Sequence, residues 1–247
     1  MARIIVVGGT GNIGARVVEK LRAHGHDAVA ASRHSGVDAY TGEGLAKALE
    51  GADVVVDTTQ SPSYEEKAVR DYFTTSTAHL LAAEKTAGVG HHVALTIVGT
   101  DRPQDITFFH GKAAQEELVR ESGIPFTLVH ATQFFDFVQA VVFTGAHDDE
   151  VRVSDGLIQP IAADDVATAI ARSAAARPAG DVEVAGPEAF PIAEFVQGWL
   201  AAKGDARTVV AAHESPYFGA IIEERTLLPV EGAQLFPTAY AEWLKTL

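Results

Sequence analysis

One lysine follows a group of aromatic side chains in the stretch Thr107–Val119, which reads TFFHGKAAQEELV. Lys112 follows Phe108, Phe109 and His110, with Gly111 between His110 and the lysine, where a helical pattern emerges from a loop. The imidazole of His110 titrates near neutral pH and could move a proton. If the lysine only solvates a helix end, it carries no function. If it lies over a cofactor, it takes part in the chemistry, and the surrounding elements decide between these two interpretations.

A glycine cluster near the N-terminus provides the second candidate. Residues 9–14 read G-x-G-x-x-G directly after an apolar strand pattern and before a helical one, which is the context in which this motif binds a dinucleotide. The glycines allow a tight turn, bring backbone N–H groups close to a pyrophosphate and open a helix whose N-terminus favours negative charge. The residues predicted to hold the cofactor here are Gly8, Gly9, Thr10, Gly11, Asn12, Ile13 and Gly14.

Ser32 and Arg33 end the second predicted strand, where an NAD-binding fold usually carries an acidic residue. A guanidinium pairs bidentately with a 2′-phosphate, and the serine hydroxyl can donate another hydrogen bond. The pattern favours NADP(H), with NAD(H) as the alternative, although Arg33 could also stack on the adenine or solvate the strand end. Thr58 and Thr59 end the third predicted strand, at the edge that meets the adenosine half of the cofactor, and are predicted to contact it.

These residues need a scaffold in which strand ends and helix starts meet at one edge. Apolar segments of strand length alternate with segments of helical periodicity, which indicates βαβ units and a parallel sheet. Strands are expected at 3–9, 27–33, 52–59, 91–99 and 125–131, and helices at 12–25, 44–51, 64–87 and 111–123. The strands are apolar nearly throughout, as expected when helices cover both faces of a sheet.

The alternation loosens after about residue 145. A helix is expected after an N-cap at Asp164, and a strand, a turn and another helix within 180–204. The predicted fold class is α/β, a Rossmann-like doubly wound parallel sheet with a small C-terminal substrate-binding cap. We expect a single NAD(P)-binding domain over residues 1–247, in which residues from about 145 to 247 add strands and helices and form the cap.

Composition narrows the classes of function. The chain of 247 residues has a formal net charge of −14, so nucleic acid and anionic membrane are poor partners. It has no cysteine, and no metal-ligand spacing is found; His91 and His92 alternate faces on a strand and cannot easily chelate one ion. With no signal-peptide pattern and no apolar run of membrane-spanning length, we expect a cytoplasmic protein. The oligomeric state is left open.

Several motifs together support a family resemblance. They are VVGGTGNIG, ASR, GADVVVDTT, LTIVGTDR, QPIAADDVA and, most specific, SGIPFTLVHATQFF after a lysine-bearing helix. On these motifs the chain resembles the atypical short-chain dehydrogenase/reductases, in their NmrA-like NAD(P)-binding branch. The resemblance implies a Y-x-x-x-K pair, in which the lysine binds the nicotinamide ribose and the tyrosine protonates a carbonyl. Lys112 takes the lysine position, Thr96, or less so Thr100, stands near a Ser/Thr position, and Phe108 replaces the tyrosine.

The missing tyrosine leaves three hypotheses. In the first, His110 supplies the proton to a carbonyl substrate. In the second, a quinone-like or aromatic substrate, polyketides included, accepts hydride without a strong protein acid, and its reduced form could react with O₂ for net hydroxylation. In the third, the chain senses NADP(H) as a regulatory protein without turnover. The favoured function is the second, an NAD(P)H-dependent oxidoreductase acting on a small aromatic molecule.

Substrate contacts are expected where the fifth strand ends and around the aromatic pair. Loops at this edge of a doubly wound sheet commonly carry function. The residues predicted to contact substrate are Phe108, Phe109, His130, Gln133 and Phe134. The adjacent acids Glu116 and Glu117, on the helix that carries Lys112, are expected to face solvent or to pair locally.

Overall fold

A seven-stranded sheet organises the chain, and the computed structural model describes residues 1–102 and 105–247 of it. Its strands are β1 Arg3–Val7, β2 Asp27–Ala31, β3 Val54–Asp57, β4 His91–Ile97, β5 Phe126–Ala131, β9 Gly180–Ala185 and β12 Gln234–Leu235. Their order in the sheet is β12-β9-β5-β4-β3-β1-β2. β1 pairs in parallel with β2 and β3, and β3 pairs in parallel with β4. This is the predicted Rossmann-like doubly wound sheet.

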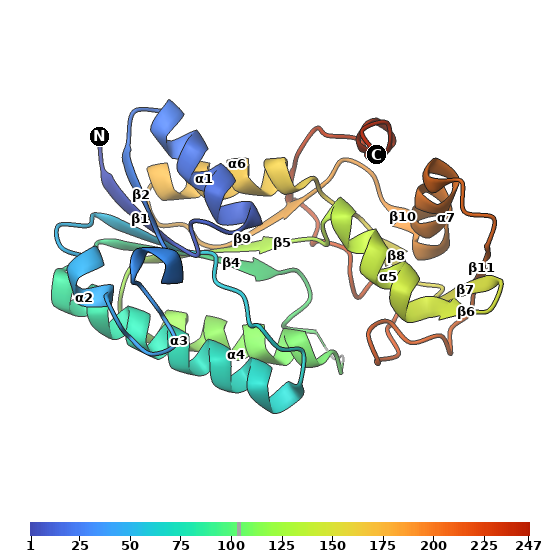
Figure 1. Cartoon of the computed structure of the whole chain (residues 1–247), viewed down its shortest axis with the longest axis horizontal. Helices are drawn as coiled ribbons and strands as arrows, with labels where there is room; N and C mark the ends of the chain where they lie inside the picture. The colour runs from blue at the N-terminus through green and yellow to red at the C-terminus, as the bar shows by residue number, and fades with distance from the viewer. Residues whose placement is uncertain (103–104) are drawn as a thin grey trace. The chain divides into compact units, whose positions relative to one another are not determined.

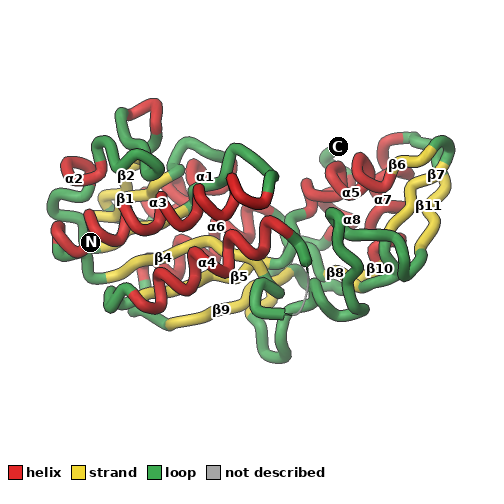
Figure 2. Tube along the Cα trace, turned by 90° about the horizontal axis from the view of Figure 1, so that it is seen from below, coloured by secondary structure: helices red, strands yellow, loops and turns green. Residues whose placement is uncertain are grey.

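Helices cover both faces of this sheet. Helices α1 (Asn12–Ala23) and α6 (Ala163–Ala175) lie on one face, and α3 (Glu66–Ala87) and α4 (Thr107–Glu121) lie side by side on the other (Figures 1 and 2). The strands are accordingly apolar on both sides: Ile4, Ile5 and Val6 of β1 are all fully buried. The continuous apolar runs in the sequence therefore reflect a sheet that is covered on both faces.

Several element boundaries differ from the prediction. Helix α4 begins at Thr107, so the residues 108–110, expected in a loop, form its first turn. Strand β2 ends at Ala31, and the residues Arg33–Ser35 form a short 3₁₀ helix, η1, while the expected helix at 44–51 is only the short α2, Leu45–Ala48. Asp164 lies in the first turn of α6 instead of preceding it, where its carboxylate still opposes the positive end of the helix dipole.

The chain divides into two compact units by its internal contacts. The first comprises Met1–Thr96, Thr107–His130 and Val166–Val182, and the second comprises Ile97–Ile106, Ala131–Asp165 and Glu183–Leu247. The second unit therefore takes in segments on the N-terminal side of residue 145 as well as the expected C-terminal third. The first unit contains the glycine turn and Lys112.

The second unit has its own small sheets and core. Strands β6 (Ala146–His147), β7 (Glu150–Val153) and β11 (Thr208–Ala211) form one sheet, and β8 (Leu157–Ile158) pairs with β10 (Phe190–Pro191). Its helices are η2 Phe135–Phe137, α5 Val138–Gly145, α7 Ile192–Lys203 and α8 Tyr240–Leu244. The ring of Tyr240 packs against Phe135 and Phe195, at centroid distances of 5.3 and 4.7 Å.

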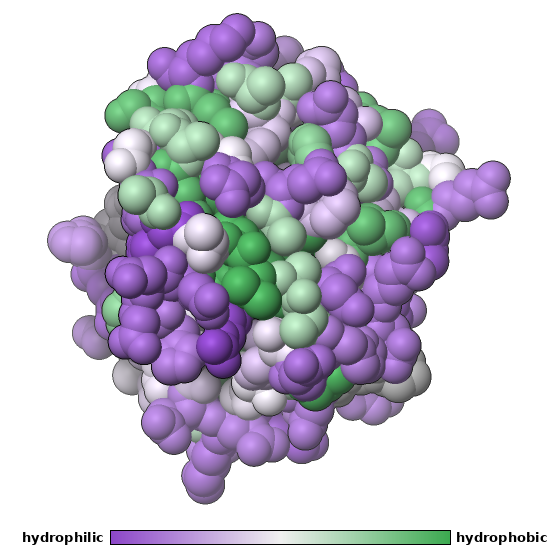
Figure 3. All heavy atoms as spheres, turned by 90° about the vertical axis from the view of Figure 1, so that its right-hand side faces the viewer, coloured by the Kyte–Doolittle hydropathy of each residue, from purple (hydrophilic) through white to green (hydrophobic). Residues whose placement is uncertain are grey.

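The surface mixes polar and apolar side chains. The face in Figure 3 shows a band of apolar side chains bordered by hydrophilic ones. Large apolar side chains that are exposed in the second unit include Phe143, Val210, Ile221, Val230 and Leu235. Of the helices in residues 1–102 and 105–247, none is an apolar segment of membrane-spanning length.

Candidate functional site

Three glycines of the turn between β1 and α1, Gly8, Gly9 and Gly14, leave no room for a side chain. Gly8 has a φ of 79°, in the left-handed region that favours glycine. A Cβ on Gly14 would lie 2.3 Å from the carbonyl oxygen of Gly8, and one on Gly9 would lie 2.6 Å from that of Val6. Close backbone approach therefore explains these glycines, as the dinucleotide motif predicts.

The N-terminus of α1 opens from this turn without a side-chain cap. Gly11 is the N-cap residue, no side chain accepts a hydrogen bond there, and the first turn contains no acidic residue. The free N–H groups and the helix dipole together favour an anion at this point.

A cavity of about 560 Å³ lies beside the turn, within the first unit. Seven residues that the sequence predicts for the cofactor line it: Gly8, Thr10, Gly11, Ser32, Arg33, Thr58 and Thr59. The predicted residues Gly9, Asn12, Ile13 and Gly14 shape the turn and the start of the helix without lining the cavity. The uncapped helix end and the guanidinium of Arg33 are two groups at this cavity that favour anions.

The cavity also contains residues that the sequence analysis missed. Asp38, Tyr40 and Tyr72 line it, and the two tyrosine rings stack in parallel at a centroid distance of 5.7 Å. The backbone N–H of Tyr40 donates to Asp38 Oδ1 over 2.8 Å. Asp38 thus places a carboxylate in the same cavity as Arg33. No motif indicated it, because the loop after η1 has no regular periodicity that would bring its residues to the strand ends.

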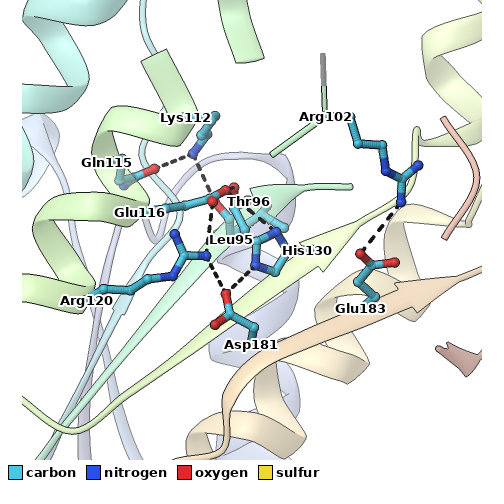
Figure 4. Close-up of polar contacts among 10 residues, drawn as sticks. All are labelled: Leu95, Thr96, Arg102, Lys112, Gln115, Glu116, Arg120, His130, Asp181 and Glu183. Atoms are coloured by element: carbon cyan, nitrogen blue, oxygen red, sulfur yellow. Dashed lines mark hydrogen bonds and ion pairs between the residues drawn. The ribbon is translucent and has the colours of Figure 1, made fainter. Parts of the chain in front are cut away.

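Lys112 is buried on the inner side of α4, with only 4% of its surface exposed. Its Nζ donates to the carbonyl oxygen of Leu95 and to Gln115 Oε1, each at 2.9 Å (Figure 4), and lies 4.3 Å from the centroid of the Phe73 ring. Burial lowers the pKa of Lys112 to about 8, against the charges of Asp57 and Glu116, which raise it. The lysine is therefore an interior group and not a solvated helix end.

A hydrogen-bonded link joins this lysine to the end of β3. Gln115 Nε2 donates to Asp57 Oδ2 over 2.8 Å, while Asp57 Oδ1 accepts the N–H of Thr59 over 2.8 Å. Because Thr59 lines the cavity, Asp57 orders a cofactor-side loop and also anchors the partner of Lys112. These contacts give Asp57 a loop-ordering role.

Thr96 and His130 belong to a buried polar cluster beneath the same helix. Thr96 Oγ1 donates a hydrogen bond to Glu116 Oε1. His130 Nδ1 lies 3.6 Å from that carboxylate, and its Nε2 lies 2.9 Å from Asp181 Oδ1 (Figure 4). Glu117 is exposed as expected, whereas Glu116 is buried and pairs with Arg120 one turn further along α4.

His130 is part of β5, and both of its ring nitrogens face carboxylates. The spacing of Lys112, Glu116 and Arg120 on one helix could have indicated the inner part of this cluster. Asp181 could not have been found this way, because it comes from a strand about fifty positions later.

The aromatic side chains near Lys112 are mostly packing residues. Phe109 is 5% exposed, and Phe108 is half-buried and packs edge-on against Phe73 at a centroid distance of 5.5 Å. His110 lies half-buried in the same turn of α4. The position that the resemblance assigns to a tyrosine is thus occupied by a well-packed ring without a hydroxyl.

Gln133 and Phe134 lie in the second unit. The Gln133 amide is buried, and neither its oxygen nor its nitrogen has a hydrogen-bond partner among the described residues. Leaving a buried amide unpaired costs free energy, so the side chain is suited to bind a polar group of a ligand or a water molecule. Phe134 is half-buried and its backbone bridges to Ile161.

The adjacent histidines of β4 point to opposite faces of the sheet, as their alternation predicts. His91 Nε2 lies 2.9 Å from Thr127 Oγ1, and burial lowers the pKa of His91 to about 4. His92 Nδ1 lies 2.8 Å from Glu84 Oε1, and both side chains are fully buried. Within the described part of the chain, no cluster of His, Asp or Glu side chains is arranged for a metal ion.

The glycine turn and the cavity beside it have the features of a dinucleotide-binding site, and comparison with known proteins agrees. Residues 8–178 match the family described as NAD(P)H-binding, and the chain belongs to that family. The chain is also 32% identical, over 225 residues, to the NAD(P)H azoreductase of Xenophilus azovorans, with 81% of this chain and 74% of that protein covered. The predicted NAD(P)-binding family is thereby confirmed.

Solved structures with low sequence identity share the fold. The dTDP-4-dehydrorhamnose reductase of Bacillus anthracis, in complex with NADP, superposes with a TM-score of 0.73 at 15% identity, covering 99% of this chain and 98% of that one. The NADPH-dependent quinone oxidoreductase of Escherichia coli, complexed with NADPH, gives 0.71 at 18% identity, covering 98% and 99%. These matches establish a common fold over nearly the whole chain.

Proposed function

We propose that this NAD(P)H-dependent oxidoreductase transfers hydride to a conjugated aromatic acceptor of the quinone type. The observation that carries the proposal is Phe108. Its packed ring stands at the position from which, by the resemblance, a tyrosine would protonate a carbonyl. The 32% identical relative named as an azoreductase supports the same substrate class, because an azo group is also a conjugated acceptor.

The chemistry explains why such an acceptor needs no strong acid nearby. Hydride from a bound nicotinamide converts a quinone into a hydroquinonate, whose charge is delocalised over an aromatic ring. Protonation can follow later, so positioning supplies most of the rate enhancement. A simple ketone becomes a localised alkoxide instead, and its reduction benefits from a positioned acid.

Different residues of the first unit would bind different parts of the cofactor. The uncapped start of α1, after Gly11, would hold the pyrophosphate, and Ser32 and Arg33 would hold a 2′-phosphate, which favours NADP(H) over NAD(H). Thr58 and Thr59 would contact the adenosine half. Lys112 would hold the ribose beside the nicotinamide, exchanging one of its present protein acceptors for a ribose hydroxyl.

A second candidate function is a sensor that binds NADP(H) without turnover. It is favoured by the state of Lys112, whose ammonium already has two protein acceptors and an aromatic face. A lysine satisfied in this way could serve a structural purpose alone. Binding of NADPH without oxidation by any acceptor would support this candidate.

The test measures the oxidation of NADPH, through the loss of its absorbance, with a panel of acceptors. The panel compares quinones, azo compounds and simple ketones. We expect turnover with quinones or azo compounds and little with ketones. Oxygen uptake beyond that measured with the acceptor alone would indicate that the reduced product reacts with O₂. The proposal would then include net hydroxylation of the substrate. The variant Phe108→Tyr should raise ketone reduction by on the order of a hundredfold. No oxidation with any acceptor would contradict the proposed function.

A further inference from the structure

Five aromatic side chains of the first unit form a continuous series of ring contacts, which we call the aromatic row. Successive ring centroids are 5.7, 5.5, 5.5 and 5.9 Å apart in the order Tyr40, Tyr72, Phe73, Phe108 and Tyr64. At one end of the row, Tyr40 and Tyr72 line the cavity beside the glycine turn. The function proposed above assigns no role to Tyr64, at the other end.

The ring of Tyr64 is largely exposed to solvent. The residue is 73% exposed, whereas Phe73 is fully buried and Phe109 is 5% exposed. Apart from Met1, the large apolar side chains that are exposed among the described residues of the first unit are Tyr40 and Tyr64, the two ends of the aromatic row. A single exposed ring needs no explanation, but a ring that continues a packed aromatic row is suited to bind a flat ligand.

Two closely packed helices hold Tyr64 beside Phe108. Tyr64 lies in the loop just before α3, and Phe108 lies in the first turn of α4. A Cβ on Gly111 of α4 would lie 2.6 Å from Val69 Cγ1 and 3.1 Å from Phe73 Cδ2, so the two helices approach closely at this glycine. This packing restrains the start of both helices, where the rings of Tyr64 and Phe108 meet at a tilt of 40°.

The aromatic row also reaches the lysine of the candidate site. Phe108 and Lys112 are four residues apart on α4 and therefore share one face of the helix. Phe73 is their common neighbour, because its ring packs edge-on against Phe108 and its centroid lies 4.3 Å from Lys112 Nζ. If Lys112 holds the ribose beside the nicotinamide, the reactive ring is bound near Phe108, and Tyr64 is the exposed ring that contacts Phe108.

Building on the function proposed above, we propose that the rings of Tyr64 and Phe108 bind the aromatic acceptor, with Tyr64 stacking on it. A conjugated acceptor is flat, and aromatic rings attract one another in offset-stacked and tilted arrangements. The centroids of Tyr64 and Phe108 are 5.9 Å apart, a span that a fused bicyclic ring system covers better than a single ring. The acceptor that these rings fit is therefore a fused-ring quinone. Tyr64 holds it through its ring, and its hydroxyl is not required, because a quinone needs no positioned acid.

The test separates loss of the ring from loss of the hydroxyl. The variants are Tyr64→Ala and Tyr64→Phe, and the matched control is Phe143→Ala, which removes a ring that is 83% exposed in the second unit. For each protein, kcat and KM are measured with naphthoquinone, which has two fused rings, and with benzoquinone, which has one. NADPH binding is measured by fluorescence titration. The chain has no cysteine that these quinones could alkylate.

We expect Tyr64→Ala to raise the KM for naphthoquinone by about fivefold or more, because stacking on the acceptor is lost. The rise should be smaller for benzoquinone, which offers less area to stack. The kcat and the Kd of NADPH should stay close to the wild-type values, since Tyr64 does not line the cofactor cavity. Tyr64→Phe and Phe143→Ala should keep the wild-type KM for both quinones.

Four results would overturn the proposal while the proposed function stands. Tyr64→Ala could keep the wild-type KM for naphthoquinone. Tyr64→Phe could raise that KM as much as Tyr64→Ala does, which would assign the effect to the hydroxyl. The KM for naphthoquinone and the Kd of NADPH could rise together, which would mark a structural role. An equal rise for both quinones would contradict the preference for fused rings.

Failure of the proposed function itself gives a different result, in which the wild type oxidises NADPH with no acceptor. Equilibrium dialysis of naphthoquinone against the protein saturated with NADP⁺ then tests the two rings, because NADP⁺ has no hydride to transfer. Retention of naphthoquinone by the wild type that is reduced in Tyr64→Ala would support binding at these rings without the reaction. No retention by the wild type, or equal retention by both proteins, would overturn it.

Discussion

At the scale of single residues, the proposal assigns the choice of cofactor to Arg33, because its guanidinium lines the cavity and can pair with a 2′-phosphate. Replacing Arg33 by Ala should weaken NADPH binding by roughly tenfold or more, because a hydrogen bond to a charged group contributes about 1.5–3 kcal/mol. The same variant should weaken NADH binding much less, because NADH has no 2′-phosphate. Fluorescence titration of both cofactors measures the difference. Arg207→Ala removes an equal charge from the second unit, where Arg207 pairs with Asp205, and serves as the control. Equal weakening of both cofactors by Arg33→Ala would contradict the assignment.

The buried ammonium of Lys112 should leave a signature in stability. Its pKa is about 8 in the folded chain against 10.5 for an unperturbed lysine. The unfolded chain therefore holds more protons between these values, and folding becomes more favourable as pH rises. This stabilisation is complete above pH 10.5 and is lost as pH falls through about 8, with a limit of about 3 kcal/mol.

Lys112→Met removes that titration. The free energy of unfolding, measured in urea at several pH values, should rise for the wild type relative to the variant between pH 8 and 10.5. Other titrating groups are common to both proteins and cancel in the comparison. A constant difference across this range would mean that the amine is already solvated.

At the scale of elements, helix α3 and strand β4 are joined by a fully buried pair, Glu84 and His92. Burial opposes charge on His92, but the Glu84 carboxylate outweighs it and raises the pKa of the histidine. Glu84 Oε2 and His92 Nε2 have no other partner among the described residues. Each group therefore depends on the other, and removal of one leaves an uncompensated polar group in the interior.

Glu84→Ala should accordingly lower the free energy of unfolding by about 3 kcal/mol, and the double variant with His92→Ala should cost less than the sum of the two single changes. Urea unfolding of the three variants gives the coupling. Glu66→Ala, an exposed acid on the same helix, should cost less than about 1 kcal/mol. Additive losses from the pair would show that the contact contributes only packing.

The sequence could predict the order of the elements, but not every boundary or every residue of the site. The order of strands and helices through residue 131 follows from periodicity, because a sheet covered on both faces must consist of apolar runs. The start of α4 was placed four residues late, since Phe108 and Phe109 pack into the core and extend the helix beyond its polar pattern. Asp38 and Asp181 were missed because their positions depend on how a loop and a distant strand fold back.

At the scale of the whole molecule, the division into two units bears on how the chain unfolds. The chain passes from one unit to the other five times, since the first unit is made of three segments and the second of three. Neither unit is formed by one continuous segment of the chain, so we do not expect either unit to fold before the other. Strands β5 and β9 each begin in the first unit and end in the second, so melting of either unit breaks strands of the same sheet.

We therefore expect a single cooperative thermal transition, although the cavity for the cofactor lies within the first unit. NADP⁺ at a hundredfold its Kd should stabilise the whole chain by about 2.7 kcal/mol and raise the temperature of that single transition. Differential scanning calorimetry with and without NADP⁺ tests this, and Arg33→Ala should reduce the shift at the same NADP⁺ concentration. Two transitions, of which NADP⁺ moves only one, would mean that the units unfold independently and that the shared strands β5 and β9 do not couple them.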